Sequence, residues 1–220
     1  MPKNLPRIND IDVKYIISFD LDLKKPMNLP KPKELKHGAK KLLETLYLND
    51  ELSDVKIFCE DKIFHSHKLI LGGHSKVFKN MLFNNDMVEA TSGEIKIIDT
   101  PAIAMKNLLF YIYHENVEDE MITHDLLVAA DKYDIQELVN ICINFMKKNL
   151  NDKNVVNIMT SAFLINQKEL FRFAFKWVFT YNDAGDGHNV EIEAWKEFKE
   201  KDPVLANKML EEAVFKSGKL

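Results

Sequence analysis

The stretch SDVKIFCEDKIFHSHKLILGGHSKVFKNML, residues 53–82, decides the fold. It contains two β-rich runs, 55–59 and 62–71, that are separated only by Glu60 and Asp61. Two polar residues between two such runs are typical of a tight β-hairpin. The sequence therefore predicts an antiparallel pair of strands at this point.

A helix is predicted immediately after the hairpin. Gly72 and Gly73 interrupt the β-rich pattern, and we expect them to relieve a tight turn from strand to helix. Ser75 is placed to cap the next helix, because a serine hydroxyl accepts a hydrogen bond from a first-turn amide. The apolar residues of that helix are Val77, Phe78, Met81 and Leu82.

Upstream of this stretch, residues 12–23 alternate between apolar and polar and predict one long half-buried strand. Residues 24–33 carry three prolines and predict a linker. The apolar spacing over residues 34–48 predicts a helix.

Downstream, the pattern predicts a polar loop and then a strand at 94–98, and Pro101 suits the first turn of the helix that follows. Residues 122–150 predict two helices joined near Asp134, and 154–179 predict two more. Segment 181–189 is turn-like, and the last helical stretch is broken at Pro203. The fold class is therefore α+β, with a small mixed sheet outnumbered by helices.

The composition is that of an ordinary globular protein, with 220 residues of which 46% are hydrophobic and 29% charged. The net charge of −4 leaves no basic excess to neutralise a phosphate backbone or an anionic membrane surface. Nucleic acid and membrane are therefore not expected partners. Two cysteines, Cys59 and Cys142, are too few for a disulfide scaffold and favour a reducing compartment. With no apolar leader at the N-terminus, we expect a cytosolic or nuclear protein.

Several motifs in a fixed order resemble the BTB/POZ domain. They are SDVKIF, FHSHKLIL, HSKVFKNML, GEIKIID, LLFYIY and LLVAADKYDIQELVNICINFM, and the resemblance covers residues 36–150. Residues 151–220 are similar to the BACK or three-box helices that follow this domain in speckle-type POZ (MATH-BTB) proteins. Residues 1–35 stand where the last strand of a MATH domain and a linker would be, without a complete MATH domain.

The resemblance implies a homodimeric adaptor, not an enzyme, with no cofactor. Members of the group bind the third cullin paralogue and hold a protein substrate for ubiquitination by a cullin-RING ligase. The predicted dimer interface is Ala39, Leu42, Leu43, Leu46 and Ile70, of which Leu43, Leu46 and Ile70 match family positions at the two-fold axis. Met87, Val88 and Glu89 match the hydrophobic-x-Glu cullin contact. The alternative is a BTB scaffold that self-associates without recruiting a cullin.

Each interface prediction has a simpler interpretation. The leucine stripe of helix 34–48 either covers another chain or packs on the core of its own domain. Met87 lies in a polar loop without periodic apolar partners, and it either enters a pocket of a partner or folds back onto Phe83.

Other chemistry is weakly indicated. His65, His67 and His74 lie near Cys59, but the pattern lacks a second metal-ligand pair, and we expect a buried hydrogen bond from His67, with Asp54 as a candidate partner. Ser66 lacks the glycine-flanked turn of a nucleophile.

A second group of residues could suggest catalysis or a ligand. Asp131 and Asp134 are explained by a solvated helix end. The aromatic series in the C-terminal half favours helix packing over a hydrophobic ligand; it comprises Phe163, Phe171, Phe173, Phe175, Trp177 and Phe179.

Overall fold

The computed structural model describes residues 32–180 and 193–215, with side chains for 40–179 and 193–213. The chain divides into two compact units, Met1–Ala39 and Lys40–Leu220. The predicted strand at 12–23, most of the predicted linker and the turn-like segment 181–189 lie outside the described residues. The features that position the candidate surfaces belong to the second unit. Helix α2 (Pro32–Leu46) crosses the boundary between the units, and its end, from Lys40, belongs to the second.

The sheet has three strands in the order β2-β1-β3. Strands β1 (Val55–Cys59) and β2 (Lys62–Ser66) form the predicted antiparallel hairpin, with Cys59 opposite Lys62 at its closed end. Glu60 in the two-residue turn has a φ of 53°, the left-handed conformation that such turns need. Strand β3 (Glu94–Ile97) pairs with β1 in parallel, which makes the sheet mixed.

The second β-rich run is shorter as a strand than the sequence predicts. It ends at Ser66, and helix α3 (Lys68–His74) begins two residues later. The carboxylate of Asp54 accepts a hydrogen bond from the Lys68 backbone N–H at 2.8 Å, which satisfies one of the unpaired amides of the first helical turn. The run Leu69–Ile70–Leu71 is therefore helical, and a side chain distant in sequence satisfies an amide of its first turn.

Gly72 and Gly73 were predicted to relieve a turn, but both lie inside α3. A side chain at Gly72 would come within 2.7 Å of a ring carbon of Phe83, at the end of the next helix. The glycine thus allows α3 and that helix to pack closely.

Helix α4 (Lys76–Phe83) begins as predicted, with the Ser75 hydroxyl accepting a hydrogen bond from the Phe78 N–H at 3.0 Å. The polar loop that was predicted before β3 instead contains a short helix, α5 (Val88–Ser92). Gly93 ends it with a φ of 68°.

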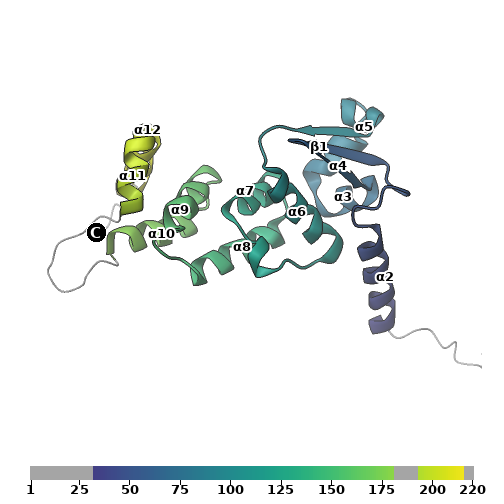
Figure 1. Cartoon of the computed structure of the whole chain (residues 1–220), viewed down its shortest axis with the longest axis horizontal. Coiled ribbons are helices and arrows are strands. Elements are labelled where there is room, and N and C mark those ends of the chain that lie inside the picture. Colours follow the sequence, from purple (N-terminus) through teal and green to yellow (C-terminus); the bar gives the residue numbers. More distant parts are fainter. Residues whose placement is uncertain (1–31, 181–192, 216–220) are drawn as a thin grey trace, which may run out of the picture. The chain divides into compact units, whose positions relative to one another are not determined.

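The core combines buried residues of the sheet, of α3 and α4, and of three further helices, α6 (Ala102–His114), α7 (His124–Lys132) and α8 (Gln136–Lys148), and it continues into the helices that follow (Figure 1). A short 3-10 turn, η2 (Asp119–Met121), precedes α7. Helices α7 and α8 are joined at Asp134, as predicted, and its φ of 52° makes the sharp connection.

Four further helices follow, in the predicted order. They are α9 (Val155–Leu164), α10 (Lys168–Thr180), α11 (Glu193–Lys201) and α12 (Pro203–Phe215). Helix α9 contacts α7, and α10 contacts α8, so this helical region packs directly on the preceding one. Pro203 begins α12, where its missing N–H costs nothing.

Candidate protein-interaction surfaces

The leucines of α2 differ in how they meet their own domain. Leu42 is 60% exposed, and Leu43 is partly exposed. Leu46 and Ile70 are partly buried and pack against the domain core. The side chain of Ala39 lies outside the described residues. Part of the predicted stripe therefore covers its own core, and Leu42 remains available to another chain.

Tyr47 fastens the end of α2 to α6. Its ring meets Phe110 edge to face at 5.6 Å between ring centroids and His114 at 5.0 Å. Its hydroxyl donates a hydrogen bond to the Lys106 carbonyl at 3.4 Å. Burial raises the pKa of Tyr47 to about 12, so the hydroxyl stays protonated at neutral pH.

Helix α5 places the second predicted site on the surface between α4 and β3. Val88 is 77% exposed, whereas Met87 and Glu89 are partly exposed. The Met87 N–H donates a hydrogen bond to the Asn84 carbonyl at 2.9 Å, which fixes the entry to the helix. The sequence identified these three residues but not the helix that presents them.

Phe83 adds apolar surface close to α5 in the sequence and was not predicted as part of a site. Its side chain is 51% exposed at the end of α4, although its ring also contacts α3 at Gly72. The signal that could have found it is its position: it ends the apolar pattern of α4 and precedes the polar residues 84–86.

The three histidines near the hairpin have separate partners. His65 Nδ1 lies 3.2 Å from the Ser53 hydroxyl, and His74 Nδ1 donates to the carbonyl of its own helix at Ile70. Within the part of the chain that the structure describes, no group of three histidine, cysteine or acidic residues is arranged to hold a metal ion.

His67 makes a buried contact, but its partner is not Asp54, which was the expected one. Its Nδ1 lies 2.8 Å from the hydroxyl of Tyr113 on α6, and its backbone N–H donates to the same hydroxyl at 3.0 Å. Burial lowers the pKa of His67, and the nearby Asp54 carboxylate opposes this shift. Asp54 was the wrong partner: its carboxylate accepts the hydrogen bond from the Lys68 N–H at the start of α3.

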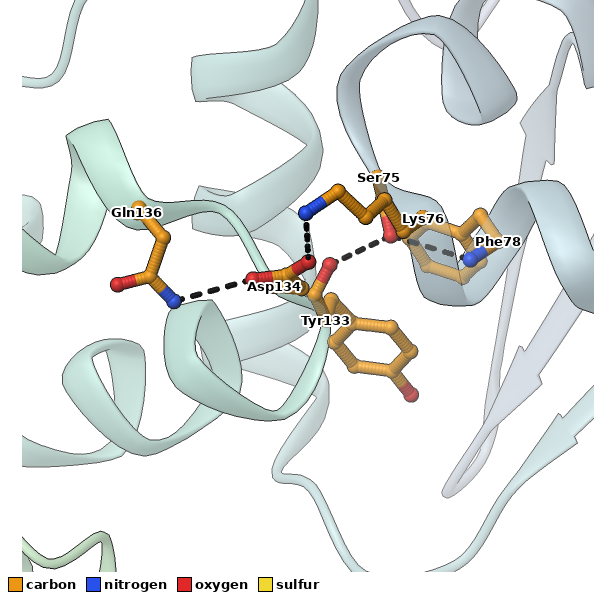
Figure 2. A network of polar contacts seen from close by, with 6 residues as sticks. All are labelled: Ser75, Lys76, Phe78, Tyr133, Asp134 and Gln136. Carbon is orange, nitrogen blue, oxygen red and sulfur yellow. Dashed lines mark hydrogen bonds and ion pairs between the residues drawn. The ribbon is translucent and has the colours of Figure 1, made fainter.

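Asp134 belongs to a structural network at the α7–α8 junction (Figure 2). Its carboxylate lies 3.2 Å from the Lys76 ammonium and accepts a hydrogen bond from the Gln136 amide at 3.1 Å. The hydrogen bond from Gln136 and the contact with Lys76 lower the pKa of Asp134. Burial raises the pKa of Asp131. These contacts link α4 to the α7–α8 junction.

The Ser75 hydroxyl completes the same link, because it donates to the Tyr133 carbonyl at 2.5 Å while it caps α4 (Figure 2). The ring of Tyr133 stacks on Phe78 with centroids 4.4 Å apart. Two segments 58 residues apart are thus joined by one hydroxyl and one ring pair.

Comparison with known proteins identifies this arrangement. Residues 43–150 match the family model of the BTB/POZ domain. This part of the chain is a BTB/POZ domain. Domains of this family are protein-interaction scaffolds that typically dimerise, and they are generally not enzymes.

Two relatives and one solved structure illustrate the likeness. An Arabidopsis thaliana BTB/POZ domain-containing protein is 31% identical over 176 residues, which is 79% of this chain and 53% of the relative. The Caenorhabditis elegans BTB and MATH domain-containing protein 42 is 30% identical over 74% of this chain and 40% of its own length. The BTB domain of zebrafish PATZ1 has a TM-score of 0.44 and 19% identity, covering 52% of this chain and 95% of that domain. The chain thus spans about half or less of the length of these two relatives.

After the BTB/POZ domain, the aromatic series mostly packs helix on helix. Phe171 is buried, and its ring lies 5.7 Å from that of Phe163 and 5.8 Å from that of Phe175. Phe173 is 42% exposed and lies outside this packing. A cavity of about 180 Å³ opens between α9, α10 and α12. It is lined by Ala162, Phe163, Asn166, Lys168, Phe171 and Glu212.

No described helix has both the length and the apolar character needed to cross a membrane. Cys59 and Cys142 are both free and buried. Burial raises the pKa of Cys142 to about 12, so it is an inert thiol at neutral pH. Both pack in the core as small residues, and the Cys59 thiol also donates a hydrogen bond to the Thr100 carbonyl at 3.0 Å.

Proposed function

We propose that this protein is a homodimeric adaptor that links a protein substrate to a cullin-RING E3 ubiquitin ligase. The observation that carries the proposal is α5, a short surface helix of the BTB/POZ domain that presents an exposed valine, Val88, between Met87 and Glu89. An exposed apolar side chain beside a carboxylate suits a partner that offers an apolar pocket rimmed by a hydrogen-bond donor.

The group assignment is part of the same proposal. We place the chain in the speckle-type POZ group, with residues 36–150 as the BTB/POZ domain and 151–220 as BACK or three-box-like helices. The presence of a MATH domain in the name of the Caenorhabditis elegans relative supports this group. Residues 1–35 would then be a linker and the remnant of a MATH domain. The two free, buried cysteines are in keeping with a cytosolic or nuclear location.

Dimerisation is supported by the exposed part of the α2 stripe. Removing one leucine side chain from water contributes about 1.5 to 3 kcal/mol, and a two-fold interface counts each residue twice. Leu42 and Leu43 supply that surface. Leu46 and Ile70 support this surface from the side of the core, because both pack against the core.

The dimer is tested by changing Leu42 and Leu43 together to aspartate. Two buried carboxylates on each side of the interface are expected to give a monomer, which light scattering would measure. Thr45→Asp is the matched control, because Thr45 is exposed on the same helix and the change also adds one negative charge. If the double variant keeps the dimer mass, α2 does not form the interface.

Cullin binding is tested by Val88→Asp. Loss of an apolar contact at an interface centre costs about 2 kcal/mol or more, roughly thirtyfold in Kd. Titration of the full chain with the purified third cullin paralogue would measure it, with Met87→Asp as a second variant. Ile63→Asp is the control, since Ile63 is 53% exposed on β2, at the opposite edge of the sheet from β3.

The second candidate is a self-associating BTB scaffold that recruits no cullin. One observation favours it: Met87, the first residue of the predicted contact, is only partly exposed. If the wild-type protein is dimeric but does not bind the cullin at tens of micromolar, the scaffold function replaces the adaptor function.

A further inference from the structure

Helix α5 is too short to hold its own shape. Five residues close little more than one helical turn, and an isolated helix of that length is not stable in water. None of its residues is buried, so apolar packing does not hold it either. The contacts at its two ends must therefore position the residues that it presents.

The first turn of α5 is tied to the end of α4. The side chain of Asn84 accepts a hydrogen bond from the Asp86 N–H at 3.1 Å, and its carbonyl accepts one from the Met87 N–H at 2.9 Å. These bonds are local, since they join residues two and three positions apart. They fix the direction of the chain but not the distance of α5 from the rest of the domain.

The last turn is held against β1 by the main chain. The Gly93 N–H donates to the Glu89 carbonyl at 3.0 Å, and the Lys56 N–H donates to the Gly93 carbonyl at 2.8 Å. A side chain at Gly93 would lie 2.9 Å from the Asp54 carbonyl, so only glycine fits there. The Ala90 carbonyl also belongs to the last turn, where helix carbonyls have no partner within the helix.

The side chain of Lys68 reaches that carbonyl. Its ammonium donates a hydrogen bond to the Ala90 carbonyl at 2.8 Å across a separation of 22 residues. Its own backbone N–H is held by the Asp54 carboxylate at 2.8 Å. A lysine near the end of a helix also interacts favourably with the partial negative charge of the carbonyls there.

From these contacts we propose that Lys68 is a positioning residue for the partner-binding helix. It contacts no partner itself and sets where α5 presents Val88 and Glu89 by holding the Ala90 carbonyl. The Lys68 ammonium thus links the start of α3 directly to the last turn of α5. It rests on the proposed function only for its effect on cullin binding.

The test is Lys68→Met, which keeps most of the apolar stem and removes the donor. Amide hydrogen exchange at Ala90 and Gly93 is expected to become at least about tenfold faster, with amides of the β1–β2 hairpin unchanged. Cullin affinity is expected to fall about tenfold, and the dimer mass to stay the same. Lys68→Arg, which restores a cationic donor, is expected to recover most of both effects.

Lys79→Met is the matched control, because Lys79 is an exposed lysine of α4 and the change is chemically the same. The positioning role is overturned if hydrogen exchange at α5 is unchanged in Lys68→Met. It is also overturned if the wild-type protein binds the cullin and Lys68→Met binds it with the same affinity. If the wild type binds no cullin, the proposed function fails, and the exchange experiment alone still decides the role of Lys68.

A measurement on the wild-type protein covers the case in which Lys68→Met does not fold. Limited acetylation of the native protein followed by mass spectrometry compares the two amines directly. We expect Lys68 to be modified several-fold more slowly than Lys79, because its ammonium is engaged. Equal rates would overturn the proposal.

Discussion

The BTB/POZ domain and the helices that follow it are held together by different kinds of contact. In the BTB/POZ domain, polar side chains join segments far apart in sequence: Ser75 reaches the Tyr133 carbonyl, and Lys132 pairs with Asp99. Each of these contacts requires a donor atom and an acceptor atom held at a specific distance and angle.

In the C-terminal helices, a series of aromatic rings runs from α9 to α11. Neighbouring centroids lie between 4.5 and 6.0 Å apart. Ring pairs tolerate tilts and small shifts, and here the interplanar angles range from 25° to 79°. The long-range polar contacts of the BTB/POZ part, which occur beside ring pairs such as Phe78 with Tyr133, therefore depend on the identity of their side chains, whereas the ring series of the C-terminal part depends mainly on side-chain volume. The rings of the series belong to Phe163, Phe171, Phe175, Phe179, Trp195 and Phe198.

The largest effect is expected from removing the Trp195 ring, which lies between Phe179 and Phe198 in this series. Trp195 is fully buried and stacks on Phe198 at 5.4 Å, so Trp195→Ala should cost about 3 to 5 kcal/mol of the stability of the C-terminal helices. Hydrogen exchange of α11 amides would measure the loss, and amides of the β1–β2 hairpin are the internal control. Trp195→Phe keeps much of the volume and should cost far less. If Trp195→Phe lost as much stability as Trp195→Ala, side-chain volume would not be what stabilises the C-terminal helices.

A smaller effect is expected at the polar junction of the BTB/POZ domain. Ser75→Ala leaves the Tyr133 carbonyl and the Phe78 N–H without their partner, a cost of about 1 to 3 kcal/mol. Urea denaturation would measure it. Ser92→Ala is the control, since its exposed hydroxyl at the end of α5 accepts a hydrogen bond from the Glu94 N–H. Ser75→Thr keeps a hydroxyl at this residue. If it recovers only part of the stability that Ser75→Ala loses, the position of the hydroxyl determines its contribution.

The smallest effect concerns pH. Burial lowers the pKa of His67 in the folded protein below its ordinary value of 6.5. Below about pH 6.5 the unfolded chain therefore binds a proton that the folded protein does not, and the free energy of unfolding should fall as the pH decreases from 7 to 5. Denaturation curves across that range should show this slope, and His67→Gln should reduce it.

The sequence predicted the elements whose stabilising contacts join residues a few positions apart. The hairpin follows from two β-rich runs around Glu60 and Asp61, and α4 follows from Ser75 three residues before Phe78. Helices α3 and α5 were missed because their partners are distant in sequence. Asp54 caps α3 from 14 residues away, and Lys68 holds α5 from 22. A short apolar run such as LIL does not itself choose between strand and helix, and a five-residue polar helix has no periodic pattern to find.

The candidate site likewise combines residues that the sequence predicted with contacts that it did not predict. The sequence singled out Met87, Val88 and Glu89 through their motif, but the presentation of Val88 and Glu89 on a helix depends on Gly93 and Lys68. For α2 the periodicity marked the stripe but could not tell Leu42, which faces solvent, from Leu46, which meets the core. Both kinds of leucine satisfy the same spacing. The roles of these residues in binding stay predictions.

The parallel pairing of β1 with β3 has a consequence for the order of folding. The hairpin closes over two residues, and such turns form in about 1 to 10 microseconds. Strand β3 can join only after the chain from 60 to 93, with its three helices, has returned to β1. Closing that longer loop carries an entropy cost that grows with the logarithm of its length. We therefore expect the hairpin to form before β3 pairs, so that α5 and its exposed valine take their final place among the last steps of folding, when the sheet is completed.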